Sequence, residues 1–260
     1  MENKEVARYW NENADDWTKL SREGYDTYRD AFNTPAMMGM LPDVAGLNGL
    51  DIGCGEGHNT RLVAERGAKM TGIDISEVFI RHAMDEETRN PRGIKFITGD
   101  ACELPFEGET FDFAVSFMCL MDTPSIDRAF AEAYRVLKPG GFLQFSILHP
   151  CFMLPYKQNI HDDNGQVRAI EIGGYFMGGE DVDEWTFSTQ PAEQKEGVRK
   201  FRIPYFYRTL SEWINTLIGA GFTIEAMGEP HPDDNTVRQY PSVQDAQVTA
   251  YFLHLRGRKD

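Results

Sequence analysis

Three glycines at alternate positions follow a short apolar run that ends in an acidic residue, in the segment Leu50-Asp51-Ile52-Gly53-Cys54-Gly55-Glu56-Gly57. The pattern predicts a buried strand, a tight turn and a helix over residues 58–66. Glycine lets the backbone take positive φ and lets a ligand approach it closely. The unpaired N–H groups and the positive dipole end of the following helix favour negative charge. We therefore expect a nucleotide-like ligand at this turn.

The spacing of the glycines does not fit a dinucleotide such as NAD. The dinucleotide fingerprint is G-x-G-x-x-G, with the pyrophosphate at the helix N-terminus. Here the third glycine, Gly57, comes one position early, and His58 stands where the fingerprint has glycine. A buried carboxylate at Asp51 would repel pyrophosphate, but it would attract a cation such as the ammonium group of an amino acid. The turn thus favours a nucleoside that carries an amino acid.

Five segments, taken in order, resemble the class I S-adenosylmethionine (SAM) methyltransferases. They are Asp51–Gly57, Thr71–Ser76, Ile97–Ala101, Phe111–Ser116 and Val136–Gly141. The likeness is close over residues 45–150 and looser over 205–256. It implies SAM as the cofactor and S-adenosylhomocysteine (SAH) as the product. The pattern looks most like the small-molecule methyltransferases that include the quinone-biosynthesis enzymes.

The resemblance assigns cofactor roles to particular residues. Asp51 would lie near the SAM amino group, Asp74 would accept hydrogen bonds from the two ribose hydroxyls, and Asp100 with Ala101 would contact the adenine amino group. The expected cofactor set is Asp51, Gly53, Cys54, Gly55, Gly57, Asp74, Ile75, Asp100, Ala101, Ser116 and Phe117. Structural alternatives stay open: a helix cap for Asp51, turns for Asp74 and Asp100, and plain core for Ser116 and Phe117.

A second set of residues is expected on the acceptor side. His149 follows the strand at 141–148 and could act as a general base, because its reference pKa lies near neutrality; a structural histidine is the alternative. Aromatic side chains near the N-terminus could face a sulfonium cation or pack on the core. The expected acceptor set is Tyr9, Trp17, Met118, His149, Tyr207 and Arg208, with Trp10, Tyr205 and His231 as further candidates.

Alternating strands and helices must position these side chains. Helices are expected over residues 4–41. Strands are expected at 47–52, 68–74, 94–98, 111–117 and 141–148. Further helices are expected at 58–66, 76–89 and 124–137. Thr123 is expected to cap the last of these helices, Pro124 to occupy its first turn, and Pro139-Gly140-Gly141 to end it. Such alternation favours a parallel sheet with helices on both sides.

The alternation of strands and helices stops over residues 150–204. A segment of this length without a clear period indicates an ordered insertion or a lid. Thr209-Leu210-Ser211-Glu212 then forms a capping box for a helix to about Ala220, and strands are expected at 222–227 and 247–255. The resemblance implies a Rossmann-like α/β sheet of seven strands in the order 3-2-1-4-5-7-6, the last antiparallel. We expect one methyltransferase domain over 1–260: a helical cap (1–45), a SAM-binding core (46–150), the insertion (151–204), and a C-terminal helix with two strands (205–260).

The composition of the chain limits the kinds of binding partner that we expect. The net charge of −15 disfavours nucleic acid, because phosphate binding draws on clusters of Lys and Arg. The four cysteines are scattered without zinc spacing and indicate reduced thiols in a cytoplasmic protein. No signal peptide or membrane span is expected. Asp122 is available as a metal ligand, but the strand at 141–148 ends in His-Pro, so no metal is expected. A monomer or a homodimer is expected.

These features favour transfer of a methyl group from SAM to an O, N or C atom of a small-molecule acceptor. The protein would act by proximity and alignment, with His149 as an optional base. A non-catalytic SAM- or SAH-binding sensor or partner subunit would carry the same glycine turn and Asp74. A different SAM reaction, or a nicotinamide enzyme on a related fold, is a weaker alternative.

Overall fold

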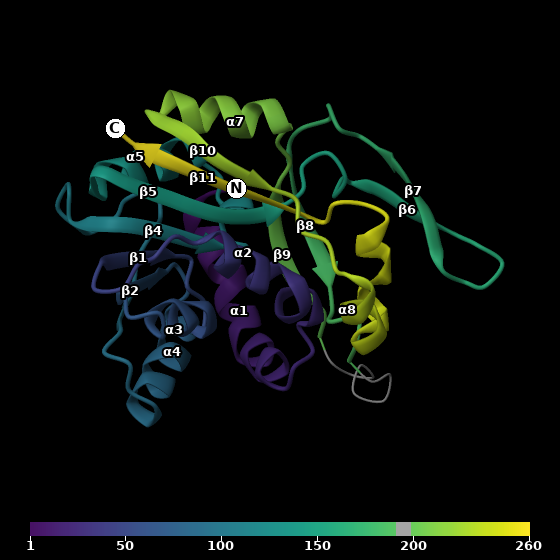
Figure 1. Ribbon diagram of the computed structural model, residues 1–260, viewed down its shortest axis with the longest axis horizontal. Helices are drawn as coiled ribbons and strands as arrows, with labels where there is room; N and C mark the ends of the chain where they lie inside the picture. Colours follow the sequence, from purple (N-terminus) through teal and green to yellow (C-terminus); the bar gives the residue numbers. More distant parts are fainter. Residues whose placement is uncertain (191–198) are drawn as a thin grey trace.

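The computed structural model describes residues 1–190 and 199–260, and a seven-stranded sheet runs through its centre (Figure 1). The strand order is β3-β2-β1-β4-β5-β11-β10. The strands are β1 (Asn48–Ile52), β2 (Lys69–Asp74), β3 (Lys95–Thr98), β4 (Phe111–Phe117), β5 (Leu137–Leu148), β10 (Phe222–Gly228) and β11 (Phe252–Lys259). The strands β1 to β5 pair in parallel, whereas β11 runs antiparallel to both of its neighbours. The predicted Rossmann-like sheet is confirmed.

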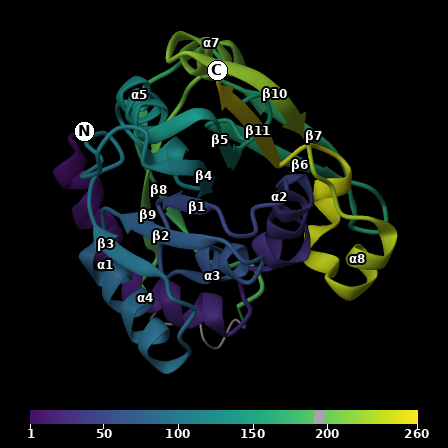
Figure 2. The ribbon, with the colours of Figure 1, turned by 60° about the vertical axis from the view of Figure 1, so that its left-hand side comes forward.

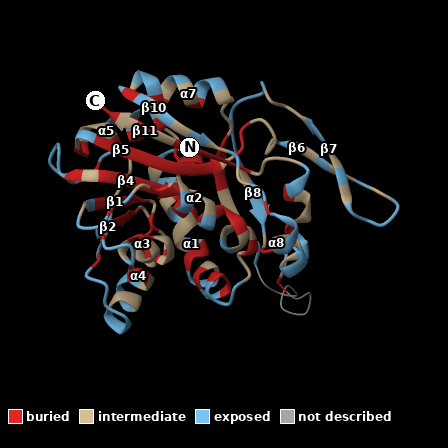
Figure 3. Ribbon diagram, in the orientation of Figure 1, coloured by how far each residue is buried: buried red, intermediate tan, exposed pale blue. Residues whose placement is uncertain are grey.

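Helices cover both faces of this sheet (Figure 2). They are α1 (Asn3–Arg22), α2 (Thr34–Met40), α3 (His58–Ala64), α4 (Glu77–Arg89), α5 (Ile126–Val136), α7 (Leu210–Gly219) and α8 (Asp234–Gln239), with a π-helical turn η1 (Arg29–Asn33) and the 3₁₀ turns η2 (Leu120–Asp122) and η3 (Pro241–Gln247). Successive side chains of a strand point to opposite faces. In β4, Phe113 therefore packs in one core with Met37 of α2, while Ala114 packs in the other with Phe130 of α5. The central strands are buried as a result (Figure 3).

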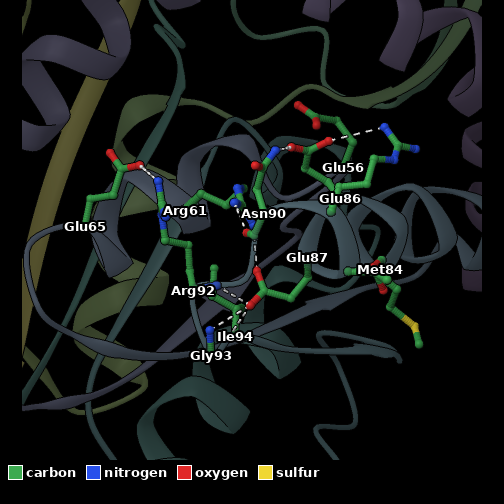
Figure 4. A network of polar contacts seen from close by, with 12 residues as sticks. Glu56, Arg61, Glu65, Met84, Glu86, Glu87, Asn90, Arg92, Gly93 and Ile94 are labelled. Carbon is green, nitrogen blue, oxygen red and sulfur yellow. Dashed lines mark hydrogen bonds and ion pairs between the residues drawn. The ribbon is translucent and has the colours of Figure 1, made fainter.

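The turn between α4 and β3 is fixed by one carboxylate (Figure 4). Oε1 of Glu87 accepts hydrogen bonds from the backbone N–H groups of Arg92, Gly93 and Ile94, at 2.5, 2.7 and 3.2 Å. Its other oxygen accepts from Nη1 of Arg61 on α3, at 2.6 Å. The side chain thereby satisfies N–H groups that a sharp turn would leave unpaired, and it joins two helices to the start of an edge strand.

The expected start and end of the helix at 124–137 are wrong. The helix begins at Ile126 with Ser125 at its N-cap, and it ends at Val136. Thr123 and Pro124 precede it because Nη2 of Arg208 binds their carbonyl oxygens, at 2.6 and 2.9 Å, and the backbone at Thr123 is extended. Pro139-Gly140-Gly141 lies within β5, beside an irregularity in the pairing of β4 with β5.

The last strand is also shifted from its expected position at 247–255. It covers Phe252–Lys259, and the residues before it form η3. Val243 and Ala246 are three residues apart, so a 3₁₀ turn places both on one side, where they pack with Phe32 and Phe252. Of the expected segment, Phe252–Leu255 lies in β11, whereas Gln247 is the last residue of η3.

The expected insertion consists of two antiparallel strand pairs. They are β6 (Tyr156–His161) with β7 (Val167–Gly173), and β8 (Glu180–Trp185) with β9 (Phe201–Phe206). Residues 191–198 of the insertion lie outside the described residues. The β6–β7 pair projects from the body of the molecule, whereas β9 packs against α1 (Figure 1). Asn13 of α1 makes two hydrogen bonds with the backbone of Arg202, at 2.9 and 3.2 Å.

Across residues 1–190 and 199–260, no helix is both long enough and apolar enough to cross a membrane.

The predicted capping box at the start of α7 is confirmed. Thr209 Oγ1 accepts from the N–H of Glu212 at 3.2 Å, and the Glu212 carboxylate accepts from the N–H of Thr209 at 2.6 Å. Thr209→Ala is expected to lower the free energy of unfolding by about 1 kcal/mol, because the N–H of Glu212 loses its partner. Urea unfolding measures the change. Thr209→Ser keeps the hydroxyl and should be nearly neutral; equal losses in the two variants would contradict the capping role.

Candidate cofactor and acceptor site

The glycine turn after β1 is held against the end of β2. The backbone N–H groups of Gly53 and Cys54 both donate to the carbonyl of Ile73, at 2.8 and 3.0 Å. Gly53 has φ +76°, and a Cβ placed on it would lie 2.1 Å from Sγ of Cys119, so only glycine fits. Gly55 has φ +54°, and a Cβ there would meet no atom within 4 Å. The turn therefore presents bare backbone to open space.

Two buried carboxylates flank this turn at the ends of neighbouring strands. Asp51 accepts a hydrogen bond from Oγ1 of Thr60 at 2.6 Å on one oxygen, while its buried Oδ1 has no partner. Asp74 accepts from the N–H groups of Gly55 and Ser76, both at 2.8 Å. Burial raises the pKa of Asp51 to about 7, opposed by the Thr60 hydrogen bond, and it raises the pKa of Asp74 to about 6 against two backbone hydrogen bonds.

A cavity of about 640 Å³ opens beside the turn and these carboxylates. Most of the residues predicted from the sequence line it. They are Trp17, Asp51, Gly53, Cys54, Gly55, Asp74, Ile75, Asp100, Ala101, Phe117, Met118, Tyr205 and Tyr207, together with Trp10. Asp100 is also held by the side chain of Asn3 and by the N–H of Cys102. The topology thus brings the ends of β1, β2, β3 and β4 together around one space.

Three of the predicted residues support the cavity from outside its wall. Ser116 is fully buried and its hydroxyl donates to the carbonyl of Ile52 at 2.7 Å. Gly57 is the N-cap of α3, and a Cβ there would lie 2.8 Å from the ring of Phe96. Tyr9 is buried beneath the guanidinium of Arg202, which lies 4.7 Å from its ring centroid. These three residues therefore make packing contacts outside the cavity wall, and their expected contacts with the cofactor or the acceptor stay predictions.

His149 does not face the cavity. Its Nδ1 accepts from the N–H of Cys151 at 3.2 Å, so its Nε2 carries the proton and donates to Glu229 at 2.8 Å. Both ring nitrogens are thus engaged, and burial lowers the pKa of the ring against the effect of Glu229. These contacts support the structural alternative for His149, and its role as a general base stays a prediction. Arg208 also lies outside the cavity wall. Its guanidinium donates hydrogen bonds to the carbonyl oxygens of Thr123 and Pro124.

Sequence reasoning missed several residues of the cavity wall. Asp122 of η2 was considered only as a metal ligand, yet it lines the cavity and is 5% exposed. Aromatic and acidic side chains of the insertion, namely Asp183, Trp185 and Phe187, also line it. Asp122 lies five residues beyond a predicted strand end, and that position was an available signal. The insertion residues had no such signal, because β8 and β9 do not belong to the central sheet.

A polar chain forms another part of the wall. Nζ of Lys157 on β6 donates to the hydroxyl of Tyr251 at 2.6 Å; that hydroxyl in turn bonds Asp245, whose other oxygen accepts from Tyr28 at 2.6 Å. Burial lowers the pKa of Lys157, although Asp245 opposes the shift. Segments far apart in the sequence are thereby joined at the cavity.

Two thiols also line the cavity beside the glycine turn. Cys54 and Cys119 are free, and burial raises the pKa of each well above its usual value, with the charges of Asp74 and Asp51 adding to the rise. Within the described part of the chain, no three His, Cys, Asp or Glu side chains are grouped to hold a metal ion.

The donor set fits a nucleoside that carries an amino acid. The unpaired Oδ1 of Asp51 suits an ammonium group, since a buried carboxylate oxygen without a partner is costly. Asp74 uses one lone pair of each oxygen on the backbone, so each oxygen can accept a further hydrogen bond from a vicinal hydroxyl. The open space at Gly55 lets such a ligand approach the backbone.

Comparison with known proteins agrees with this geometry. Residues 50–145 match the family described as "Methyltransferase domain". A solved S-adenosylmethionine-dependent methyltransferase from Mesorhizobium loti is 29% identical with a TM-score of 0.71, over 86% of this chain and 96% of that one.

Curated relatives match over the same region. A demethylmenaquinone methyltransferase from Tropheryma whipplei is 38% identical over 49% of this chain and 54% of its own length. A malonyl-[acyl-carrier protein] O-methyltransferase from Pectobacterium atrosepticum is 29% identical over 48% of each chain. The chain thus spans about half the length of these curated relatives.

The strand order of the sheet is that of the Rossmann-like methyltransferase fold, and residues 50–145 match a methyltransferase domain. The chain is therefore similar to SAM-dependent methyltransferases, and SAM is the cofactor that this similarity supports.

The protonation of Asp51 predicts how stability depends on pH. The folded-state pKa, about 7, lies above the unfolded value, so the folded protein holds a proton that the unfolded chain releases. The stability of the unliganded protein should therefore fall as the pH rises from about 4 to about 7, and Asp51→Asn should flatten this fall. Urea unfolding at a series of pH values measures it. The exposed Asp85→Asn serves as the control; parallel curves for wild type and Asp51→Asn would contradict the assignment.

His149 is expected to affect stability and not cofactor binding. His149→Ala removes two hydrogen bonds of a buried ring and should cost about 1–3 kcal/mol of unfolding free energy. The affinity for SAM, measured by calorimetry, should stay within about twofold of wild type. Glu229→Gln keeps a hydrogen-bond acceptor and provides the milder control. A large loss of SAM affinity in folded His149→Ala would place the residue at the cofactor.

Proposed function

We propose that this protein transfers the methyl group of SAM to an O, N or C nucleophile of a small-molecule acceptor. The observation that carries the proposal is the continuity of the cavity. One space joins Asp51, the glycine turn and Asp74 to a wall built by η2, β8 and β9. The first part fits the cofactor, and the second leaves room for an acceptor beside it.

Each part of the site has a role in this proposal. Asp51 would hold the amino group of SAM, Asp74 its ribose hydroxyls, and Asp100 with Ala101 the adenine amino group. When bound, SAM supplies a methyl group on a sulfonium that is already a good leaving group. The protein is left to align the acceptor and to exclude water, and such ordering can be worth roughly 7–11 kcal/mol. The aromatic side chains of Trp17, Trp185 and Phe187 are suited to excluding water from the cavity.

Several features support a small acceptor in place of a nucleic acid or a sensor role. The net charge of −15 works against a polyanion, and the strand pairs of the insertion contribute to the wall of the acceptor space. A non-catalytic SAM or SAH sensor needs only the cofactor part of the cavity, whereas this cavity continues past it. We propose that residues 1–260 act as one domain, as a monomer or a homodimer, and in the cytoplasm, where the free thiols would stay reduced.

Removing the Asp74 carboxylate tests the cofactor site. Asp74→Ala should weaken SAM and SAH binding by about tenfold, or about 1.4 kcal/mol, because two charge-assisted hydrogen bonds are lost. Calorimetry measures the affinities, and NAD serves as a ligand that should bind neither protein. Asp74→Asn keeps one acceptor oxygen and should lose less affinity.

Unchanged SAM affinity in Asp74→Ala would remove this residue from the site. Methyl transfer is tested separately by following SAH formation with a panel of small acceptors. A protein that binds SAM and forms no SAH with any of them would favour the sensor alternative.

A further inference from the structure

One buried carboxylate of the cavity wall is not used by the cofactor roles described above. Asp122 lies in the 3₁₀ turn η2 just after β4, where its N–H donates to the carbonyl of Cys119 at 2.9 Å and fixes the turn. The side chain is nearly fully buried and lines the cavity, and its Oδ1 has no hydrogen-bond partner. Burying a carboxyl oxygen without a partner is costly, so a ligand group that can donate to it would be stabilised.

No cation of the described residues neutralises this carboxylate by an ion pair. The charge of Arg208 acts on Asp122, but Nη2 of Arg208 donates to the carbonyls of Thr123 and Pro124. Burial raises the pKa of Asp122 well above its usual value, and the charge of Asp183 adds to the rise while Arg208 opposes it. The charge of Asp74 on β2 also raises the pKa of Asp122. In turn, the charge of Asp122 raises the pKa of Tyr205 on β9 and of Cys119.

The facing strands add a second carboxylate and aromatic rings. Asp183 and Trp185 are two residues apart on β8, so they share a face of the strand, and both line the cavity. The ring of Trp17 lies 5.3 Å from that of Trp185 and 5.0 Å from that of Phe187, between centroids. Aromatic faces attract cations through their quadrupole. Acidic and aromatic groups therefore meet in one wall, which favours a positively charged ligand.

We propose that this wall, formed by Asp122, Asp183, Trp17 and Trp185, binds the protonated amino group of an amine acceptor, and that the reaction is an N-methylation. The inference rests on the function proposed above and deepens it. The carboxylate of Asp122 accepts a hydrogen bond from the ammonium group and then its proton. The N–H bond breaks, the proton moves to a carboxylate oxygen, and the electron pair stays on nitrogen.

The remaining bonds balance without a further reactant. The nitrogen lone pair forms the new bond to the methyl carbon, and the methyl–sulfur bond breaks with its electron pair going to sulfur. The product nitrogen is again an ammonium group, and Asp122 passes its proton to solvent. Asp122 would act as a catalytic base, whereas Asp183 and the aromatic rings would hold the cation.

Calorimetry with matched probes tests this proposal on the full chain saturated with SAH. The probes are 2-phenylethylamine, which is cationic near neutral pH, the neutral 2-phenylethanol and the anionic phenylacetate. The amine should bind about tenfold more tightly than the alcohol, and Asp122→Asn should abolish this preference while leaving the alcohol affinity within about twofold. Glu184→Gln, on the other face of β8, is the control and should keep the preference.

Proton release gives a second readout that a merely structural role would not move. Burial raises the pKa of Asp122, and an ammonium ion beside the carboxylate would lower it again. Amine binding should therefore be accompanied by proton release from the wild type and by none from Asp122→Asn. Titrations in two buffers of different ionisation enthalpy measure the difference. If Asp122→Asn does not fold, Asp183→Asn should reduce the amine preference by about threefold.

Three results would overturn the inference. They are equal affinity for amine and alcohol, no binding of any of the three probes, or an amine preference that survives in Asp122→Asn. Each of these, obtained in protein that binds SAH, overturns the amine acceptor and leaves the methyltransferase proposal intact. Failure of the wild type to bind SAH would overturn both.

Discussion

The site depends on the contact between the turn after β1 and the end of β2. Two N–H groups of the turn, from Gly53 and Cys54, converge on the carbonyl of Ile73, and the next glycine donates to Asp74. These bonds fix the backbone in a left-handed shape that residues with a side chain rarely adopt. Because β1 and β2 are neighbours in the sheet, the same bonds set Asp51 and Asp74 on either side of the turn. The position of the cavity therefore depends on the backbone conformation of the glycine turn.

The central sheet could be predicted closely from the sequence because its strands alternate with helices that carry clear punctuation. The glycines, Asp51 and Asp74 were also identifiable, since a strand end followed by a glycine turn is a local pattern. The helix and strand boundaries that were predicted wrongly depend on contacts with residues far away in the sequence. The start of α5 is shifted because Arg208, which lies about 80 residues downstream in the chain, binds the carbonyls before it.

The side of the cavity that the proposal assigns to the acceptor could be predicted only in part: Trp17, Met118, Tyr205 and Tyr207 line the cavity as expected, whereas Asp122, Asp183 and Trp185 were not expected there. Its wall combines η2 with β8 and β9, and β8 and β9 form a separate pair outside the main sheet. No local period tells which residues of such a pair face inward. The partners of His149 were equally hidden: its position after a strand end suggests chemistry, yet hydrogen bonds to Cys151 and Glu229 occupy both of its ring nitrogens.

The sulfur atoms near the glycine turn have a consequence for the protein itself. A sulfonium methyl group is an electrophile, and a thiolate is a far better nucleophile than a thiol. Cys54 and Cys119 line the cavity, but burial and nearby carboxylates keep their pKa values high. If SAM occupies this cavity as proposed, the raised pKa values disfavour the thiolate form of both cysteines and, with it, methylation of the protein's own sulfur atoms.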